Sequence, residues 1–273
     1  MSRKQDSSMW GLIRKIYSKS CEVLQKDPTI LFLFILVGIL DLLALSVLFL
    51  IPSIGFLSPI VRTLWGERFL HYPENFLLLP KLFNYAHFII LTLIGVLLTS
   101  VAIKKIQACY DNSRISLVQA GKVVIRKYFG LMAIWLLFYG VFMVAMRFIL
   151  SFLPPVIFLQ FAVAFLLSLI IQSVFVFLMP AYILLGSRFL KAIWEGFLLG
   201  LKRLHITCLL ISVPMFAMIV LSFLKSIIPA FVQVVPEMVL WVLFVGVVVS
   251  TVVDLLVTTS TTILFLEREK SIL

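Results

Sequence analysis

The chain has 273 residues, of which 63% are hydrophobic and only 13% are charged. A water-soluble domain of this length needs far more polar surface, so this composition excludes a soluble globular protein. The formal net charge of +11 would suit nucleic acid, but the placement of the basic residues, given below, argues against such a partner. Apolar runs of 18 or more residues recur, and each can cross a bilayer as a helix. The sequence therefore predicts an all-α polytopic membrane protein.

In chain order, residues 1–28 are predicted to form a cytoplasmic amphipathic segment, residues 29–266 a membrane domain and residues 267–273 a cytoplasmic tail. The fourth and sixth spans are longer than one crossing needs, so they must tilt, kink or project beyond the bilayer. Pro180 is the predicted kink in the fourth span. The six predicted spans are residues 29–51, 87–103, 129–150, 155–185, 206–224 and 238–266.

Residues 52–86, between the first two spans, form the one outer connection with any bulk. Their prolines and aromatic residues predict short helices on the outer leaflet, with Trp65, Tyr72 and Tyr85 at the membrane interface. A cap over a cavity is the alternative for this segment.

Three basic stretches, each directly before an odd-numbered span, show apolar residues at helical spacing. They are "SSMWGLIRKIYSKSCEVLQKD", "SRISLVQAGKVVIRKYFG" and "SRFLKAIWEGFLLGLKRLHI". We predict an amphipathic helix in the cytoplasmic interface for each, which gives three units of interfacial helix and span. Internal duplication explains the pattern, and so does the shared environment of a basic interface. The residues predicted to contact anionic lipid are Trp194, Phe197, Lys202, Arg203, Lys122, Arg126 and Lys127.

The third of these stretches also contains a GxxxG pattern, formed by Gly196 and Gly200. Such a pair lets two helix backbones approach closely. Because it lies in the interfacial stretch and not in a span, we expect it to pack on a neighbouring helix and not to drive dimerisation.

The basic residues are distributed unequally between the two sides of the membrane. Of the 23 lysines and arginines, 18 fall in the N-terminal segment, the connections between spans 2 and 3 and between spans 4 and 5, and the tail. The positive-inside rule makes this side cytoplasmic, with both termini inside. Topology and anionic lipid therefore account for the charge, and we expect no nucleic-acid partner.

Ionisable groups within the spans are candidate functional residues, because a charge in hydrocarbon is costly. Asp41 lies near the middle of the first span, Asp254 within the sixth, and Arg147 near the outer end of the third. Each aspartate is either a proton or cation site, or a structural group that is paired or faces a water-filled crevice. A hydroxyl cluster in the sixth span either bonds to its own helix or lines a polar pathway. Its candidate members are Thr258, Thr259 and Thr261.

Motifs for catalysis or metal binding are missing from the sequence. His71, His87 and His205 each lack a second ligand three or four residues away, and no HExxH, GxSxG or phosphate loop occurs. We therefore expect no enzymatic activity, no cofactor and no metal.

Residues 177–213, "FLMPAYILLGSRFLKAIWEGFLLGLKRLHITCLLISV", combine a span that ends near Pro180 with a helix containing Ala192, Gly196 and Arg203 and then another span. This layout resembles YciC-like bacterial inner-membrane proteins, and it is similar to the membrane domain attached to some glycerophosphodiester phosphodiesterases. The resemblance implies a multi-pass protein of the bacterial cytoplasmic (inner) membrane, linked to envelope or lipid handling. It supplies no catalytic residues.

Two functions from different classes follow from the sequence. The leading prediction is a non-enzymatic integral membrane protein whose interfacial helices engage anionic lipid, or a cytoplasmic or membrane protein partner. The alternative is a small-solute or proton-coupled transporter, or a permease subunit, that uses Asp41, Asp254 and the span-six threonines. A deep polar cavity that reaches Asp41 would favour the transporter, and a solid apolar bundle would favour the first reading.

Overall fold

The computed structural model describes residues 9–51, 59, 62–63, 66–67, 71–72, 74–154, 156–186, 188–226, 228, 232 and 234–270. The chain is 89% helical, and the described residues contain no strand. Within them, six helices are long and apolar enough to cross a membrane, which confirms the predicted all-α, six-span architecture. These spans are α2 (Thr29–Leu50), α4–η4–α5 (Glu74–Ile90, Leu91–Gly95 and Val96–Tyr110), α7 (Tyr128–Ser151), α8–α9 (Ile157–Phe175 and Leu178–Leu184), α11 (Leu204–Ser226) and α13 (Met238–Lys270).

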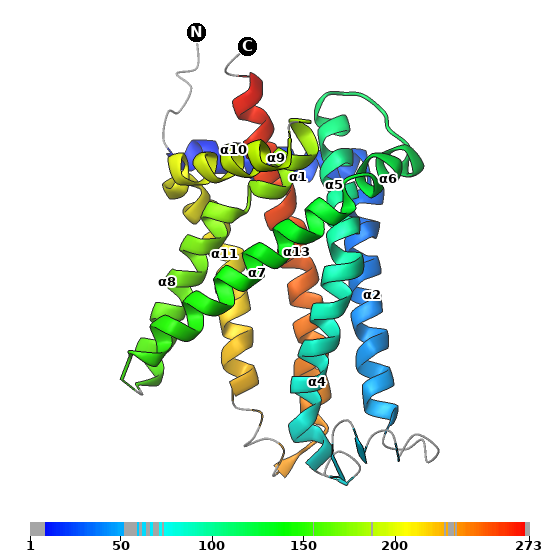
Figure 1. Ribbon diagram of the computed structural model, residues 1–273, viewed down its shortest axis with the longest axis vertical. Coiled ribbons are helices and arrows are strands. Elements are labelled where there is room, and N and C mark those ends of the chain that lie inside the picture. Colours follow the sequence, from blue (N-terminus) through cyan, green and yellow to red (C-terminus); the bar gives the residue numbers. More distant parts are fainter. Residues whose placement is uncertain are drawn as a thin grey trace.

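Three further helices lie across one end of the bundle, the same end at which α13 finishes (Figure 1). They are α1 (Met9–Lys26), α6 (Leu117–Ile125) and α10 (Phe189–Lys202). Each comes directly before an odd-numbered span, α2, α7 or α11. Both the duplication hypothesis and the shared-interface explanation fit this order.

The second span is longer than predicted, because its helix begins at Glu74 and not at His87. Pro80 lies inside the helix and leaves the carbonyl of Phe76 without its usual N–H donor. Tertiary packing compensates for this loss, since Phe76, Leu79 and Phe83 are buried together against α2 and α13. Tyr72 and Tyr85 are exposed, as interface anchors would be, whereas Trp65 lies outside the described residues.

The fourth span is broken where α8 ends and α9 begins. Pro180 cannot donate to the carbonyl of Val176, four residues earlier, and the break lies at that point. The two glycines of α10 pack directly on the break. A Cβ at Gly200 would lie 2.1 Å from the Val174 carbonyl oxygen, and one at Gly196 would lie 3.0 Å from the Leu178 Cα. The GxxxG pair thus packs on a neighbouring helix, as predicted.

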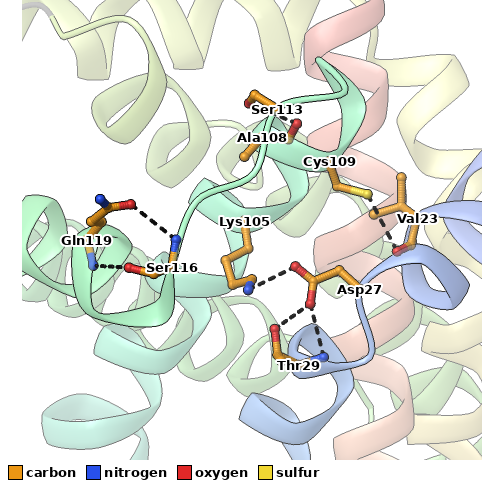
Figure 2. Close-up of polar contacts among 9 residues, drawn as sticks. All are labelled: Val23, Asp27, Thr29, Lys105, Ala108, Cys109, Ser113, Ser116 and Gln119. Carbon is orange, nitrogen blue, oxygen red and sulfur yellow. Dashed lines mark hydrogen bonds and ion pairs between the residues drawn. The ribbon is translucent and has the colours of Figure 1, made fainter.

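A buried ion pair joins the α1–α2 turn to α5 (Figure 2). Lys105 is almost fully buried, and its Nζ lies 2.9 Å from Asp27 Oδ2, while Asp27 Oδ1 accepts hydrogen bonds from the backbone N–H and hydroxyl of Thr29. Burial alone would raise the pKa of Asp27. The Thr29 hydrogen bonds and the Lys105 charge outweigh burial and hold that pKa below its ordinary value. After α5, Ser116 and Gln119 form a capping box that begins α6.

A second ionic contact ties α1 to the far end of α13. This helix has 33 residues and is therefore about 50 Å long, well beyond the roughly 30 Å of hydrocarbon. It continues to Lys270, so Glu267, predicted to begin the tail, is helical and forms ion pairs with Lys15 and Lys19. Burial would lower the pKa of Lys19, but the Glu267 carboxylate prevails and raises it.

The apolar interior consists of two separate clusters. The inner cluster lies toward the interfacial helices and includes Phe34 of α2 and Leu255 of α13. The outer cluster includes Leu45 of α2 and Val247 of α13, together with the buried residues of α4. Polar residues lie between these two clusters, and the candidate site is built there.

Candidate functional site

A carboxylate–histidine pair lies in the polar layer between the two apolar clusters. Asp41 of α2 is only 2% exposed, and its Oδ2 lies 2.9 Å from Nδ1 of His87 on α4. Its other oxygen, Oδ1, is buried and has no hydrogen-bond partner among the residues that the structure describes. His87 also stacks on Phe83, one turn earlier in α4, with 6.1 Å between ring centroids. The pair therefore places a charge-bearing group close to the middle of the first span.

A close helix contact brings Asp254 of α13 toward this pair. A Cβ at Gly38 of α2 would lie 2.7 Å from the Thr251 hydroxyl of α13, so only glycine permits this approach without a shift. Gly38 lies three residues before Asp41, and Thr251 lies three residues before Asp254. Residues three apart share a helix face, so the two aspartates are turned toward the same space.

A π-helical segment, Leu91–Gly95, follows His87 by one turn. Such segments change the backbone bonding pattern and occur frequently at functional sites. Two side chains of α7 bind here: Trp135 Nε1 donates to the Thr92 hydroxyl at 3.1 Å, and the Tyr128 hydroxyl donates to the Leu93 carbonyl at 2.8 Å. The π segment therefore fixes α7 beside the polar layer.

A cavity of about 230 Å³ lies between the second span, α7, α8–α9 and α13. Its wall is mostly apolar and includes three aromatic rings, those of Trp135, Phe138 and Phe175. Asp254 is the one charged residue in the wall, which contains no lysine, arginine or histidine. The remaining polar residues of the wall are Thr99, Gln172, Thr258, Thr261 and Thr262.

Asp41, His87 and Asp254 all line a smaller cavity of about 20 Å³, which shares Leu91, Gly95, Thr99 and Asp254 with the wall of the larger one. Asp254 lines both cavities, so its carboxylate lies between the larger cavity and the Asp41–His87 pair. Its side chain is accessible although it lies mid-helix, and it accepts no hydrogen bond from the residues that the structure describes. The described residues also contain no group of three His, Cys, Asp or Glu placed to hold a metal ion.

The structure brings some of the predicted intramembrane residues together and separates others. Asp41 and Asp254 line the same small cavity, and Thr258 and Thr261 line the larger one. Thr261 also donates to the Val257 carbonyl of its own helix. Thr259 is fully buried outside that wall, and its hydroxyl has no partner. Arg147 is exposed on α7 and pairs with no carboxylate in the described part of the chain.

His87 is the residue that the sequence reasoning missed. No second ligand lies three or four residues from it in the sequence, because its partner is on α2 and its other carboxylate neighbour is on α13. The available signal was its position: a histidine with apolar residues on both sides belongs inside the span once the helix begins earlier, at Glu74.

Helix α10 turns its small residues toward the bundle and its bulky residues outward, so lipid contact stays a prediction for Trp194 and Phe197. The buried face consists of Ala192, Gly196, Leu199 and Gly200, and not of the bulkiest residues. Trp194 is exposed and stacks on Phe197, which itself packs half-buried against Phe175 of α8. Small residues face the bundle because they allow the closest approach, which leaves the large side chains of α10 outside.

Lipid contact stays a prediction for Lys127, which also makes contacts within the bundle. Its Nζ donates to the carbonyls of Tyr182 and Ile183, at 2.8 and 3.4 Å, near the C-terminus of α9. Those carbonyls have no intrahelical donor, and a cation there also opposes the helix dipole. Burial, and then the nearby charge of Lys104, lower the pKa of Lys127. Lipid contact stays a prediction for Lys122, Arg126 and Lys202, which are exposed, and for Arg203, which is half-buried.

No protein-family model, curated protein or solved structure matches this chain. The resemblance to YciC-like proteins and to the membrane domain of glycerophosphodiester phosphodiesterases therefore remains a prediction.

Proposed function

We propose that this integral membrane protein is a small-solute transporter in which Asp41, His87 and Asp254 exchange a proton as the solute moves. One observation carries the proposal: Asp254 lines both the solute-sized cavity and the small cavity that reaches the Asp41–His87 pair. A solute in the larger cavity and a proton on the pair therefore share one carboxylate as a neighbour.

Energetic cost supports a functional role over a structural one. Ionisable groups in hydrocarbon are expensive, and a buried pair is rarely more stabilising than apolar residues of the same size. Here the cost is increased by the buried Oδ1 of Asp41, which has no partner among the described residues. Histidine changes charge near neutral pH, which suits a proton relay. No other charged residue lines either cavity.

The other predicted function, engagement of anionic lipid, is a second candidate that rests on a different part of the molecule. Exposed Trp194, Lys122, Arg126 and Lys202 lie on or beside α6 and α10, at the end where α1, α6 and α10 gather. We assign this end to the cytoplasm, in the bacterial inner membrane, on the distribution of basic residues and the family resemblance. Lipid contact there would anchor the transporter, so the two proposals are compatible.

The test uses purified protein in liposomes that contain a trapped pH-sensitive dye. Small organic cations, neutral solutes and anions are added in turn across an imposed pH gradient. We expect at least one solute to dissipate the gradient with wild type, and the conservative variants Asp41→Asn and His87→Gln to lose this effect while remaining monodisperse. Arg147→Gln, which removes a charge away from the cavities, is the matched control and should retain it. If wild type and His87→Gln dissipate the pH gradient equally, the proposal is refuted.

A further inference from the structure

We infer that the larger cavity binds a small organic cation with an apolar or aromatic body, its charge paired with Asp254. This inference rests on the proposed function, because it names the class of solute that the same site accepts.

Charge is the first argument. Asp254 is the one charged residue in the cavity wall, and no described residue is paired with it. An anionic solute would meet a carboxylate with no compensating cation in the wall. A neutral solute would displace water and leave that carboxylate buried and uncompensated, which is strongly unfavourable. A monocation supplies the missing partner.

Shape and surface give the second argument. The volume of about 230 Å³ exceeds the roughly 150 Å³ apolar cavity that accommodates benzene in another protein, so an aromatic ring with an attached ammonium group has sufficient space. Trp135 and Phe138 present π-systems that attract cations. Trp135 is already oriented by its hydrogen bond to Thr92, so its ring is held in place before a ligand binds.

The polar groups of the wall fit an ammonium better than a metal ion. A hard cation such as Ca²⁺ requires six to eight oxygen ligands, whereas this wall is mostly apolar. An ammonium group requires only a carboxylate and one or two further acceptors. Gln172 lines the cavity, is partly exposed, and carries a side-chain amide oxygen. It provides one such acceptor.

The experiment compares three probes of similar size and different charge: phenethylammonium, 2-phenylethanol and phenylacetate. Binding to the full chain in detergent is measured by calorimetry at neutral pH. We expect phenethylammonium to bind at least tenfold more tightly than either other probe. Asp254→Asn should weaken its binding at least tenfold, and Thr258→Leu, which fills the cavity without removing the carboxylate, should also weaken it. Glu195→Gln removes a carboxylate on α10, outside the cavity, and should leave binding unchanged.

Two results would overturn the inference: binding of 2-phenylethanol as tight as that of phenethylammonium, or unchanged phenethylammonium binding in both cavity variants. The failure of the proposed function gives a different signature. Charge-selective binding without solute-linked proton movement in liposomes would support the cation site and reject transport. Proton-coupled movement of another solute, with no phenethylammonium binding, would support transport and reject the cation site.

Discussion

Asp41 and His87 show how a membrane protein retains a polar pair at some cost in stability. Their side chains meet at 2.9 Å, but one carboxylate oxygen remains without a partner inside the bundle. Replacing such a pair with apolar residues of similar volume is often neutral or stabilising by about 1–4 kcal/mol. Stability alone therefore does not account for the pair.

The first prediction concerns this pair. Asp41→Leu alone should lower the free energy of unfolding by about 1–3 kcal/mol, because His87 loses its partner in a buried site. The double variant Asp41→Leu with His87→Leu should recover at least the wild-type value, since no polar group is then left unpaired. Denaturant unfolding in detergent measures all three proteins. A double variant less stable than Asp41→Leu alone would assign the pair a structural role.

The second prediction concerns the ion pair between Asp27 and Lys105. Because the folded-state pKa of Asp27 is lowered, its stabilisation is present above the ordinary value near 3.9 and is lost as pH falls through the lower folded value. Asp27→Asn should therefore cost about 3 kcal/mol at pH 7, where it leaves Lys105 buried and unpaired. The difference in the free energy of unfolding between Asp27→Asn and wild type should become smaller toward pH 3.

Melting temperatures at several pH values provide the measurement for Asp27. The control is Glu22→Gln, which removes an exposed carboxylate one turn from Lys26 on α1 and should change the melting temperature little at any pH. If Asp27→Asn lowers the melting temperature by the same amount from pH 7 to pH 3, the Asp27 carboxylate does not stabilise the fold through Lys105.

At the scale of helices, small residues determine how the interfacial layer joins the spans. Gly196 and Gly200 allow α10 to approach the break between α8 and α9, and Gly38 allows α2 to approach α13 beside the polar centre. In both places the contact is backbone against a neighbouring helix, and a single methyl group is enough to disturb it.

The third prediction compares two glycines in interfacial helices. Gly200→Ala should lower the free energy of unfolding by about 1–3 kcal/mol, because its Cβ would overlap the Val174 carbonyl oxygen. Gly121→Ala in α6 meets no atom within 4 Å, so it should be neutral or stabilising by about 0.5–1 kcal/mol. Thermal unfolding in detergent distinguishes the two, and equal effects would show that α10 does not depend on this close contact.

Apolar runs were enough to predict the number and type of the spans, because hydrocarbon forces the backbone into helices. They did not predict where α4 begins, because residues 52–86 were expected to form short outer helices. Burial of Phe76, Leu79 and Phe83 instead holds one helix that begins at Glu74. The GxxxG pair of α10 predicted a close helix contact, and the small face does pack inward. Asp41 and Asp254 stood out by their charge, but the spacing within one helix gave no sign of His87, whose partners are on two other helices.

At the scale of the whole molecule, the two ends of the bundle differ in their ionic contacts. The end with α1, α6 and α10 contains the ion pairs Lys15–Glu267, Lys19–Glu267 and Lys105–Asp27. At the opposite end, Tyr72 and Glu237 are exposed and within 3.4 Å of each other. The orientation of these ends in the membrane is open to a direct test.

The fourth prediction uses single-cysteine proteins and a membrane-impermeant maleimide. Cys21 is exposed on α1, whereas Cys109 and Cys208 are half-buried and can be replaced by alanine. In intact cells the reagent should leave Cys21 unlabelled and should label a Glu237→Cys variant that lacks the three native cysteines. Permeabilised cells should show labelling in both. The reverse pattern would invert the proposed orientation, and labelling of both in intact cells would contradict the six-span topology.

The alternation of in-plane helices and spans also affects the order in which the polar centre is assembled during synthesis. The chain emerges as three hairpins, α2 with α4–α5, α7 with α8–α9, and α11 with α13, each preceded by one of the three in-plane helices. Asp41 and His87 both belong to the first hairpin, so they can pair before the other two hairpins are synthesised. Asp254 is on α13, which follows the other five spans in the chain. The pair is therefore available from the first hairpin onward, and the cavity receives its carboxylate only after those five spans have been made.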